Sequence, residues 1–172
     1  MGIFRPNCYQ KTIFDINYES LKEKGIRCLV FDLDNTLGLI SHKTCPEQTK
    51  KLIKKLKKDF IVTISSNNTK KRIKPYLEEL DIDGVSWSLK PSIKSLLIIK
   101  QKYHLKKKEM CMIGDQIVTD VLAGKRFHIY TILVDPMGEK DLKITGLNRK
   151  LEARIIKKYE KRGLFERGKY YG

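Results

Sequence analysis

Residues Cys28-Leu-Val-Phe-Asp-Leu-Asp-Asn-Thr-Leu37 contain the strongest structural signal in this chain of 172 residues. Residues 28–33 form an apolar run of strand length that only Asp32 interrupts, and continuous runs are typical of strands buried on both faces of a parallel sheet. Asp32 and Asp34 are two positions apart, so in an extended chain their side chains point to the same side and repel each other. This pattern at a strand end indicates a cation site, because Mg²⁺ prefers one or two carboxylates together with phosphate and water oxygens.

Further apolar runs of strand length follow along the chain, at residues 60–65, 84–87, 110–113 and 129–134. Helical patterns lie between the runs, at residues 46–58, 69–80, 91–103 and 119–126, the last ending near Gly124. Pro46 and Pro91 stand where a first helical turn favours proline. Alternation of strands and helices predicts an α/β, Rossmann-like fold with a parallel sheet flanked by helices. Such sheets bind ligands at the carboxyl ends of their strands.

Polar residues follow each of the next three predicted strands. Ser65-Ser66-Asn67-Asn68 offers hydroxyl, amide and backbone N–H groups to an anion, or simply caps the following helix. Lys90 precedes Pro91 and is either a site residue or one of many surface lysines. Gly114-Asp115 allows close backbone approach and adds a carboxylate, whereas Asp120 is either a site residue or an ordinary first-turn acid.

The order of these residues is more specific than any one of them. D-x-D-x-T, a hydroxyl, a lysine and G-D-x-x-x-x-D each come directly after successive strands. Two carboxylates with a metal need a balancing cation and donors for a phosphate, and the remaining positions supply both. The pattern therefore indicates phosphate chemistry.

These residues resemble the haloacid dehalogenase (HAD) superfamily of phosphohydrolases. The resemblance extends over nearly the whole chain to the YqeG group of HAD subfamily IIIA, which is related to mitochondrial phosphatidylglycerophosphatases. The segments that resemble this group are Asp32–Leu37, Ser66–Asn68, Lys90-Pro91, Gly114–Gln116, Thr119–Val121, Arg5-Pro6 through Tyr9, and Asn148-Arg149 with Glu152. Asp135 departs from the pattern, which has an apolar residue there, and its role stays open.

The resemblance implies a role for each matched residue. Asp32 would be the nucleophile that forms an aspartyl-phosphate, and Asp34 the general acid and then the base. Mg²⁺ would bind Asp32, Asp115 and the backbone carbonyl of Asp34. The residues implied to hold the phosphate or to support the site are Thr36, Ser66, Asn67, Lys90 and Asp120, the last orienting Lys90 or the metal shell.

The spacing leaves no room for a cap domain. Residues 36–66 accommodate about one helix and a loop, and residues 66–90 one more helix. We therefore expect a single HAD-like hydrolase domain over residues 1–172 with a basic C-terminal helix. An open crevice suits a phosphate presented by something large, such as a protein, a nucleic acid end or a membrane surface.

The net charge of +16 favours anionic partners, and residues 41–110 carry 18 basic and 7 acidic residues. The alternative is that Lys-rich helical faces are only solvated. Residues 148–162 read as a helix with Leu151, Ile155 and Ile156 on one side, which would contact an anionic membrane, pack on the domain, or do both.

Other classes are disfavoured. The apolar stretches are far shorter than the roughly 20 residues of a membrane-spanning helix, and the N-terminus has no signal-peptide pattern. We expect a cytoplasmic protein, with peripheral contact at the inner membrane face left open, and reduced cysteines. The leading substrate implied by the resemblance is phosphatidylglycerophosphate. The alternatives are a protein or nucleotide phosphatase and a basic RNA- or ribosome-binding protein with an inherited site, although no RNA-binding motif is visible.

Overall fold

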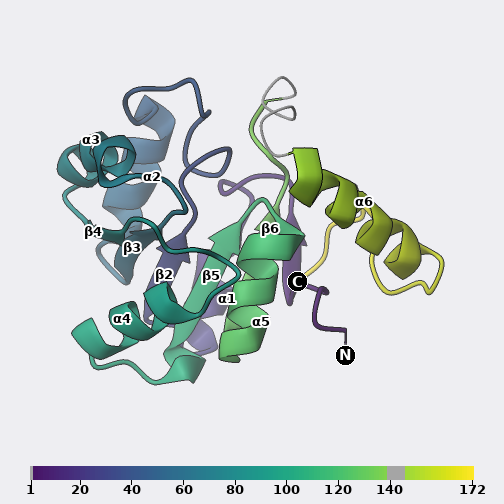
Figure 1. The fold of residues 1–172 in the computed structure, drawn as a ribbon. Coiled ribbons are helices and arrows are strands. Elements are labelled where there is room, and N and C mark those ends of the chain that lie inside the picture. The colour runs from purple at the N-terminus through teal and green to yellow at the C-terminus, as the bar shows by residue number, and fades with distance from the viewer. Residues whose placement is uncertain (1, 139–145) are drawn as a thin grey trace.

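The computed structural model describes residues 2–138 and 146–172, and a six-stranded parallel sheet forms its centre (Figure 1). The spatial order is β1-β6-β5-β2-β3-β4. The strands are β1 (Cys8–Gln10), β2 (Cys28–Phe31), β3 (Ile61–Ser65), β4 (Asp83–Val85), β5 (Met110–Gly114) and β6 (Tyr130–Val134). Every pair of neighbouring strands runs parallel, which confirms the predicted α/β class.

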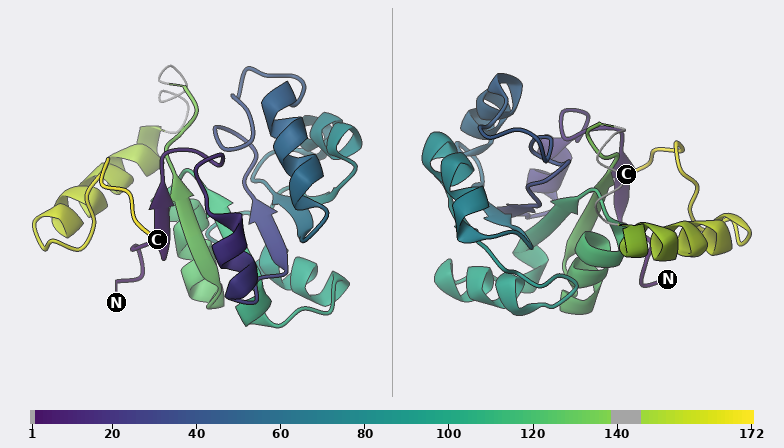
Figure 2. Two further views of the ribbon diagram at one scale, coloured as in Figure 1. Left: turned by 180° about the vertical axis from the view of Figure 1, so that it is seen from behind. Right: turned by 45° about the horizontal axis from the view of Figure 1, so that its top comes forward.

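Helices cover both faces of the sheet (Figure 2). They are α1 (Tyr18–Glu23), α2 (Glu47–Leu56), α3 (Lys70–Leu80), α4 (Lys94–Lys102), η1 (Lys107–Glu109), η2 (Ile117–Val121), α5 (Leu122–Phe127) and α6 (Gly146–Glu160). Side chains of α1, α2 and α3 join one buried cluster, and those of α4 and α5 join another on the opposite face. Between β2 and β3 the chain forms α2 alone, and between β3 and β4 α3 alone, so these connections hold no cap domain.

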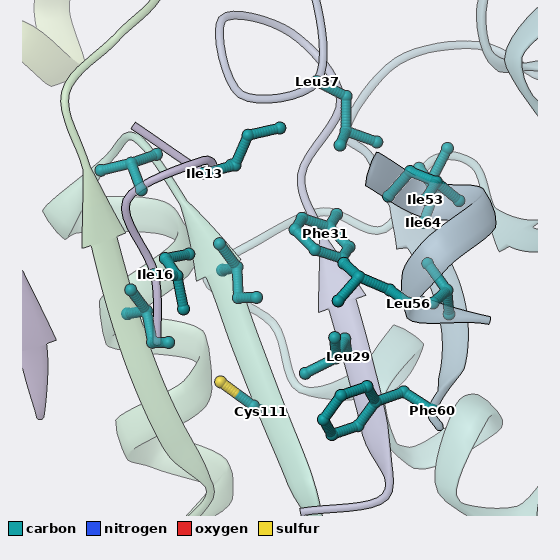
Figure 3. Close-up of a cluster of buried hydrophobic side chains, with 14 of the residues drawn as sticks. Ile13, Ile16, Leu29, Phe31, Leu37, Ile53, Leu56, Phe60, Ile64 and Cys111 are labelled. Atoms are coloured by element: carbon teal, nitrogen blue, oxygen red, sulfur yellow. The ribbon is translucent and has the colours of Figure 1, made fainter. Parts of the chain in front are cut away.

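Alternation along β2 divides the core between the two faces. Leu29 and Phe31 belong to the cluster under α2, whereas Cys28 and Val30 belong to the cluster under α4. Figure 3 shows the first cluster, with side chains of α2 lying beside those of β2. All four side chains are fully buried, as expected for a central parallel strand that reads as a continuous apolar run.

Two predicted helices differ from their expected limits. Helix α4 begins at Lys94 rather than at Pro91, because the preceding residues form a turn in which Ser92 N–H donates to Leu89 O at 2.8 Å. The fourth helix begins as the π-helical η2 and continues through Gly124 to Phe127. Gly124 does not end the helix but lets it pack closely on β6, since a Cβ at this position would lie 2.4 Å from Thr131 Cγ2.

The C-terminal segment packs beside β1. Ile155 and Ile156 of α6 pack against a buried cluster that contains Tyr9 and Phe165. These two side chains therefore pack on the domain, which was one of the two alternatives for this helix. Leu151 is exposed. Tyr9 and Tyr171 exchange backbone hydrogen bonds of 2.7 and 2.9 Å. The side chains of residues 148 and 149 lie outside the described part.

Asp135 belongs to this C-terminal contact. Its carboxylate accepts hydrogen bonds from the hydroxyls of Tyr9 and Tyr170, the latter at 2.7 Å, and lies 3.3 Å from Arg167 Nη1. The four cysteines are buried free thiols. Within residues 2–138 and 146–172, no helix combines the length and the apolar composition needed to cross a bilayer.

Candidate active site

The register of the central strands brings two acidic loops together. Phe31 of β2 pairs with Ile113 of β5, and the next backbone N–H, that of Asp32, donates to Ile113 O at 2.8 Å. The chain turns to opposite sides of the sheet after β2 and after β5, so this is the switch point where a parallel sheet opens a crevice. Asp32 and Asp115 therefore reach the same place from distant parts of the sequence.

Three buried carboxylates gather there. Oxygens of Asp32, Asp115 and Asp120 lie within 4.8 Å of one another, and all three residues are buried. Gly114 makes this approach feasible, because a Cβ at this position would lie 2.3 Å from Cγ of Asp120. Asp120 thus occupies space over the backbone that only a glycine leaves empty.

Lys90 lies among these carboxylates. Its ammonium donates to Asp32 and to Ser65 O, the latter at 2.7 Å, and forms an ion pair with Asp120 Oδ1 at 2.7 Å. The side chain of Lys90 is only 2% exposed. The amide of Asn67 holds the backbone of Lys90 in place, accepting from Lys90 N at 2.7 Å and donating to Lys90 O at 3.2 Å. Ser88 Oγ donates to the same Asn67 oxygen at 2.9 Å. The side chain of Asn67 is therefore committed to positioning Lys90.

Among the described residues, the ammonium of Lys90 forms ion pairs with two of the three carboxylates, those of Asp32 and Asp120. Burial raises the pKa of Asp32 to about 7; Lys90 opposes this rise and Asp120 adds to it. Burial lowers the pKa of Lys90, but the carboxylates of Asp120 and Asp32 outweigh it and hold that pKa above its ordinary value. Lys90 thus stays charged.

The donor set fits a divalent cation. Carboxylate oxygens of three buried residues converge in one place. Oxygen-only ligands of this kind suit a hard ion such as Mg²⁺. The predicted metal ligands Asp32 and Asp115 belong to this converging set, and Asp120 is its third carboxylate. The backbone carbonyl of Asp34 stays a predicted ligand.

The side chain of Asp34 faces Arg72 at the mouth of the site. Arg72 donates to Asp34 Oδ1 from Nη2 at 2.6 Å and from Nε at 3.1 Å, and Asn68 Nδ2 donates to Asp34 Oδ2. Arg72 also donates to His42 O at 2.7 Å. Sequence reasoning missed Arg72, whose only signal is its place in the first turn of α3, three residues after the N-cap Thr69.

A cavity of about 250 Å³ opens at these residues. Its lining comprises Asp32, Asp34, Asn35, Ile40, Ser66, Asn67, Asn68, Lys90, Gln116 and Thr119. Ser66 Oγ accepts from Asn68 N at 3.2 Å, whereas Thr36 is buried with its hydroxyl 3.5 Å from Asp115 Oδ1. A larger hollow of about 510 Å³ beside α2 and α3 contains none of the predicted site residues, whereas several of them line the smaller cavity.

Family comparisons agree with this geometry. Residues 29–110 match the model of the haloacid dehalogenase-like hydrolases, and residues 89–143 match that of the HAD-hydrolase-like proteins. The chain is 37% identical over 161 residues to the probable phosphatase YqeG of Bacillus subtilis, covering 93% of this chain and 94% of that one. It is 25% identical over 170 residues to phosphatidylglycerophosphate phosphatase 1 of Arabidopsis thaliana, covering 92% of this chain and 49% of that one.

Solved structures share the fold. The cobalt-bound deoxy-D-mannose-octulosonate 8-phosphate phosphatase of Haemophilus influenzae superimposes with a TM-score of 0.52 at 15% identity, covering 84% of this chain and 95% of that one. A HAD-like hydrolase of Porphyromonas gingivalis gives a TM-score of 0.52 at 14% identity, covering 74% and 98%.

Proposed function

Because the chain belongs to the haloacid dehalogenase-like hydrolases, as a phosphatase similar over nearly its full length to YqeG, we propose that it hydrolyses a phosphomonoester through Asp32. The convergence of Asp32, Asp115, Asp120 and Lys90 carries this proposal, since Asp32 and Lys90 of this cluster line the small cavity. A nucleophilic carboxylate splits one difficult hydrolysis into two easier steps.

In the first step, a carboxylate oxygen of Asp32 bonds to phosphorus as the bond from phosphorus to the leaving oxygen breaks. Asp34 gives that oxygen a proton. In the second step, Asp34 takes a proton from water, whose oxygen attacks phosphorus and releases Asp32 and inorganic phosphate. Arg72 and Asn68 orient Asp34 for both transfers, as their hydrogen bonds to its two oxygens support.

The remaining residues bind and position. Lys90 and Ser66 hold the phosphate oxygens, and Asn67 contributes through the backbone of Lys90, as its two hydrogen bonds to that backbone support. The hydroxyl of Thr36 is directed at Asp115, so we assign it to that carboxylate rather than to the phosphate. Mg²⁺ held by Asp32, Asp115 and the backbone carbonyl of Asp34, with the carboxylate of Asp120 beside them, would neutralise charge on the phosphate and fix its orientation.

We further propose phosphatidylglycerophosphate as the substrate of a single hydrolase domain that works in the cytoplasm, at the inner face of a membrane. The name of the Arabidopsis relative supports a lipid phosphate. The cavity supports it as well, because about 250 Å³ is below the ~300–1,000 Å³ of most small-molecule sites, and no cap encloses it. A phosphate group fits while its carrier stays outside.

Measurements of phosphate release test the proposed reaction and its metal. Asp32→Asn should abolish release from every substrate, because an amide cannot form the acyl-phosphate, and Asp34→Asn should lose about 10²–10⁴-fold. Excess EDTA should stop the wild-type enzyme, and Mg²⁺ should restore it. Retention of more than about a tenth of the activity in Asp32→Asn would refute the nucleophile.

The proposed substrate is tested separately, by comparing the rates of phosphate release from different phosphorylated substrates. Release should be faster from phosphatidylglycerophosphate in vesicles than from phosphopeptides or nucleotides. A preference for a soluble phosphopeptide or nucleotide would overturn the proposed lipid substrate, while the proposed phosphatase activity would stand. Absence of hydrolysis together with RNA or ribosome binding would favour the binding-protein alternative.

A further inference from the structure

Two large apolar side chains project from the segment that delivers Lys90 to the site. Trp87 is 61% exposed and Leu89 is 63% exposed, whereas Ser88 and Lys90 between and after them are buried. The segment therefore alternates, with its polar side chains turned into the site and its apolar side chains turned to solvent. Exposing an indole and an isobutyl group together is unfavourable unless something covers them.

Backbone hydrogen bonds hold this segment rigidly against the loop after β3. Trp87 N–H donates to Asn68 O at 2.9 Å and Ser88 N–H donates to Ser66 O at 3.0 Å. Trp87 and Leu89 have φ angles of 50° and 52°, a left-handed conformation that is uncommon for bulky residues. Strained, outward-facing apolar residues beside a site point to a role in recognition.

Apolar exposure continues into α4, and the charge around it is positive. Ile93, Leu97 and Ile98 are also exposed. The exposed Lys94 follows Ile93 directly, and no acidic residue occurs between Asp83 and Glu109. The exposed Lys70 and Lys71 begin α3 just after Asn68, whose carbonyl accepts the Trp87 N–H. Apolar side chains within a basic surround are typical of segments that lie in the headgroup region of an anionic bilayer.

We infer that residues 87–93, the rim segment, insert into the interfacial region of an anionic lipid bilayer and turn the opening of the site toward the lipid phosphates. This inference rests on the proposed lipid substrate. Trp is the residue best suited to the membrane interface, because its ring is apolar and its N–H is polar. Helix α6 is less suited to insertion, since Ile155 and Ile156 are packed against the Tyr9 cluster.

Trp87 is the single tryptophan of the chain, so its fluorescence reports on the rim segment alone. Vesicles of phosphatidylglycerol and phosphatidylcholine should shift the emission of the full-length protein to shorter wavelength. Phospholipids brominated on the acyl chain should quench it. Vesicles that sediment the protein without changing its Trp emission would overturn the inference, because another surface would then make the contact.

The variant Trp87→Asn/Leu89→Asn removes both apolar groups and keeps the backbone, since Asn tolerates the left-handed conformation. It should sediment with anionic vesicles at least about tenfold more weakly. Its thermal unfolding and its hydrolysis of p-nitrophenyl phosphate should match the wild type. Phe14→Asn is the matched control, because Phe14 is 43% exposed and borders Asp59 and Phe60, ahead of β3 and away from the site.

The possible failures are distinct. Unchanged vesicle binding of the folded double variant overturns the rim inference, whatever the substrate. A concentration-dependent dimer that the double variant loses overturns it too, in favour of a second copy of the chain. If the double variant loses vesicle binding, docking by the rim segment is supported. If the wild type then hydrolyses lipid and soluble substrates equally well, the proposed lipid substrate is overturned instead.

Discussion

At the scale of single residues, Gly114 determines whether the acidic cluster can form. Gly114→Ala would place a Cβ 2.3 Å from Asp120 Cγ and displace a carboxylate that contacts Lys90. Steric insertions into packed sites cost about 1–3 kcal/mol, so both stability and phosphate release should fall, the latter by at least about tenfold. Thermal unfolding and phosphate release measure the two effects.

Gly124→Ala is the matched control for that change. Its Cβ would lie 2.4 Å from Thr131 Cγ2, an equally close contact away from the acidic cluster. It should lower stability while the folded fraction keeps its activity. Equal losses of activity per folded molecule in the two variants would contradict a specific role for Gly114.

Asp32 makes the stability of the metal-free protein depend on pH. Burial raises its pKa to about 7 in the folded chain, against about 4 when unfolded, so the folded state binds more protons between these values. The free energy of unfolding should therefore decrease as the pH rises from about 4 to about 7. Asp32→Asn should remove this slope and be the more stable protein at about pH 8.

Chemical denaturation in EDTA across this range measures the effect. Lys51→Gln, a change on the exposed surface of α2, should leave the slope unchanged. An Asp32→Asn slope identical to that of the wild type would contradict the raised pKa of Asp32.

At the scale of elements, the long apolar runs predicted the sheet well because a buried parallel strand is apolar on both faces. Strand β1 and helix α1 were not predicted, since they have three and six residues and carry too little periodicity. The start of α4 and the continuation of α5 beyond Gly124 depend on tertiary contacts that no local pattern contains.

The acidic positions of the site were predictable because each follows a strand in a fixed order. The partners of Asp34 and Asn67 were not. Arg72 is one of 36 basic residues, and only the packing of α3 beside the loop after β2 selects it. The engagement of the Asn67 amide with Lys90 likewise depends on how two loops meet in space.

Glu152 joins α6 to the element that bears Asp120. Its carboxylate accepts from Ile117 N at 3.1 Å, at the start of η2, and pairs with Arg167 Nη2 at 2.9 Å. Glu152→Ala removes the acceptor of a buried N–H, which costs about 1–3 kcal/mol. We expect a lower melting temperature and lower phosphate release, because η2 loses a contact that holds it.

The exposed Glu160 on the same helix provides the comparison. Glu160→Ala should change neither the melting temperature nor the rate of phosphate release. A Glu152→Ala protein indistinguishable from it would show that α6 and the site are independent.

At the scale of the whole molecule, the open crevice and the positive charge suit the same kind of substrate. The connections after β2 and β3 each hold one helix, so neither of them forms a cap over the cavity at Asp32. A net charge of +16 raises the local concentration of anionic partners at such a site. These two features support the proposed substrate, a phosphate attached to a large anionic surface rather than a small metabolite.

The backbone pairing of Tyr9 with Tyr171 gives β1 a neighbour on the side away from β6. An outermost strand without such a neighbour exposes unpaired N–H and C=O groups that can template the addition of another chain. A protein shortened to end before Phe165 should consequently self-associate as its concentration rises, which light scattering would detect. By covering its own outermost strand, the C-terminal segment protects the molecule against aggregation.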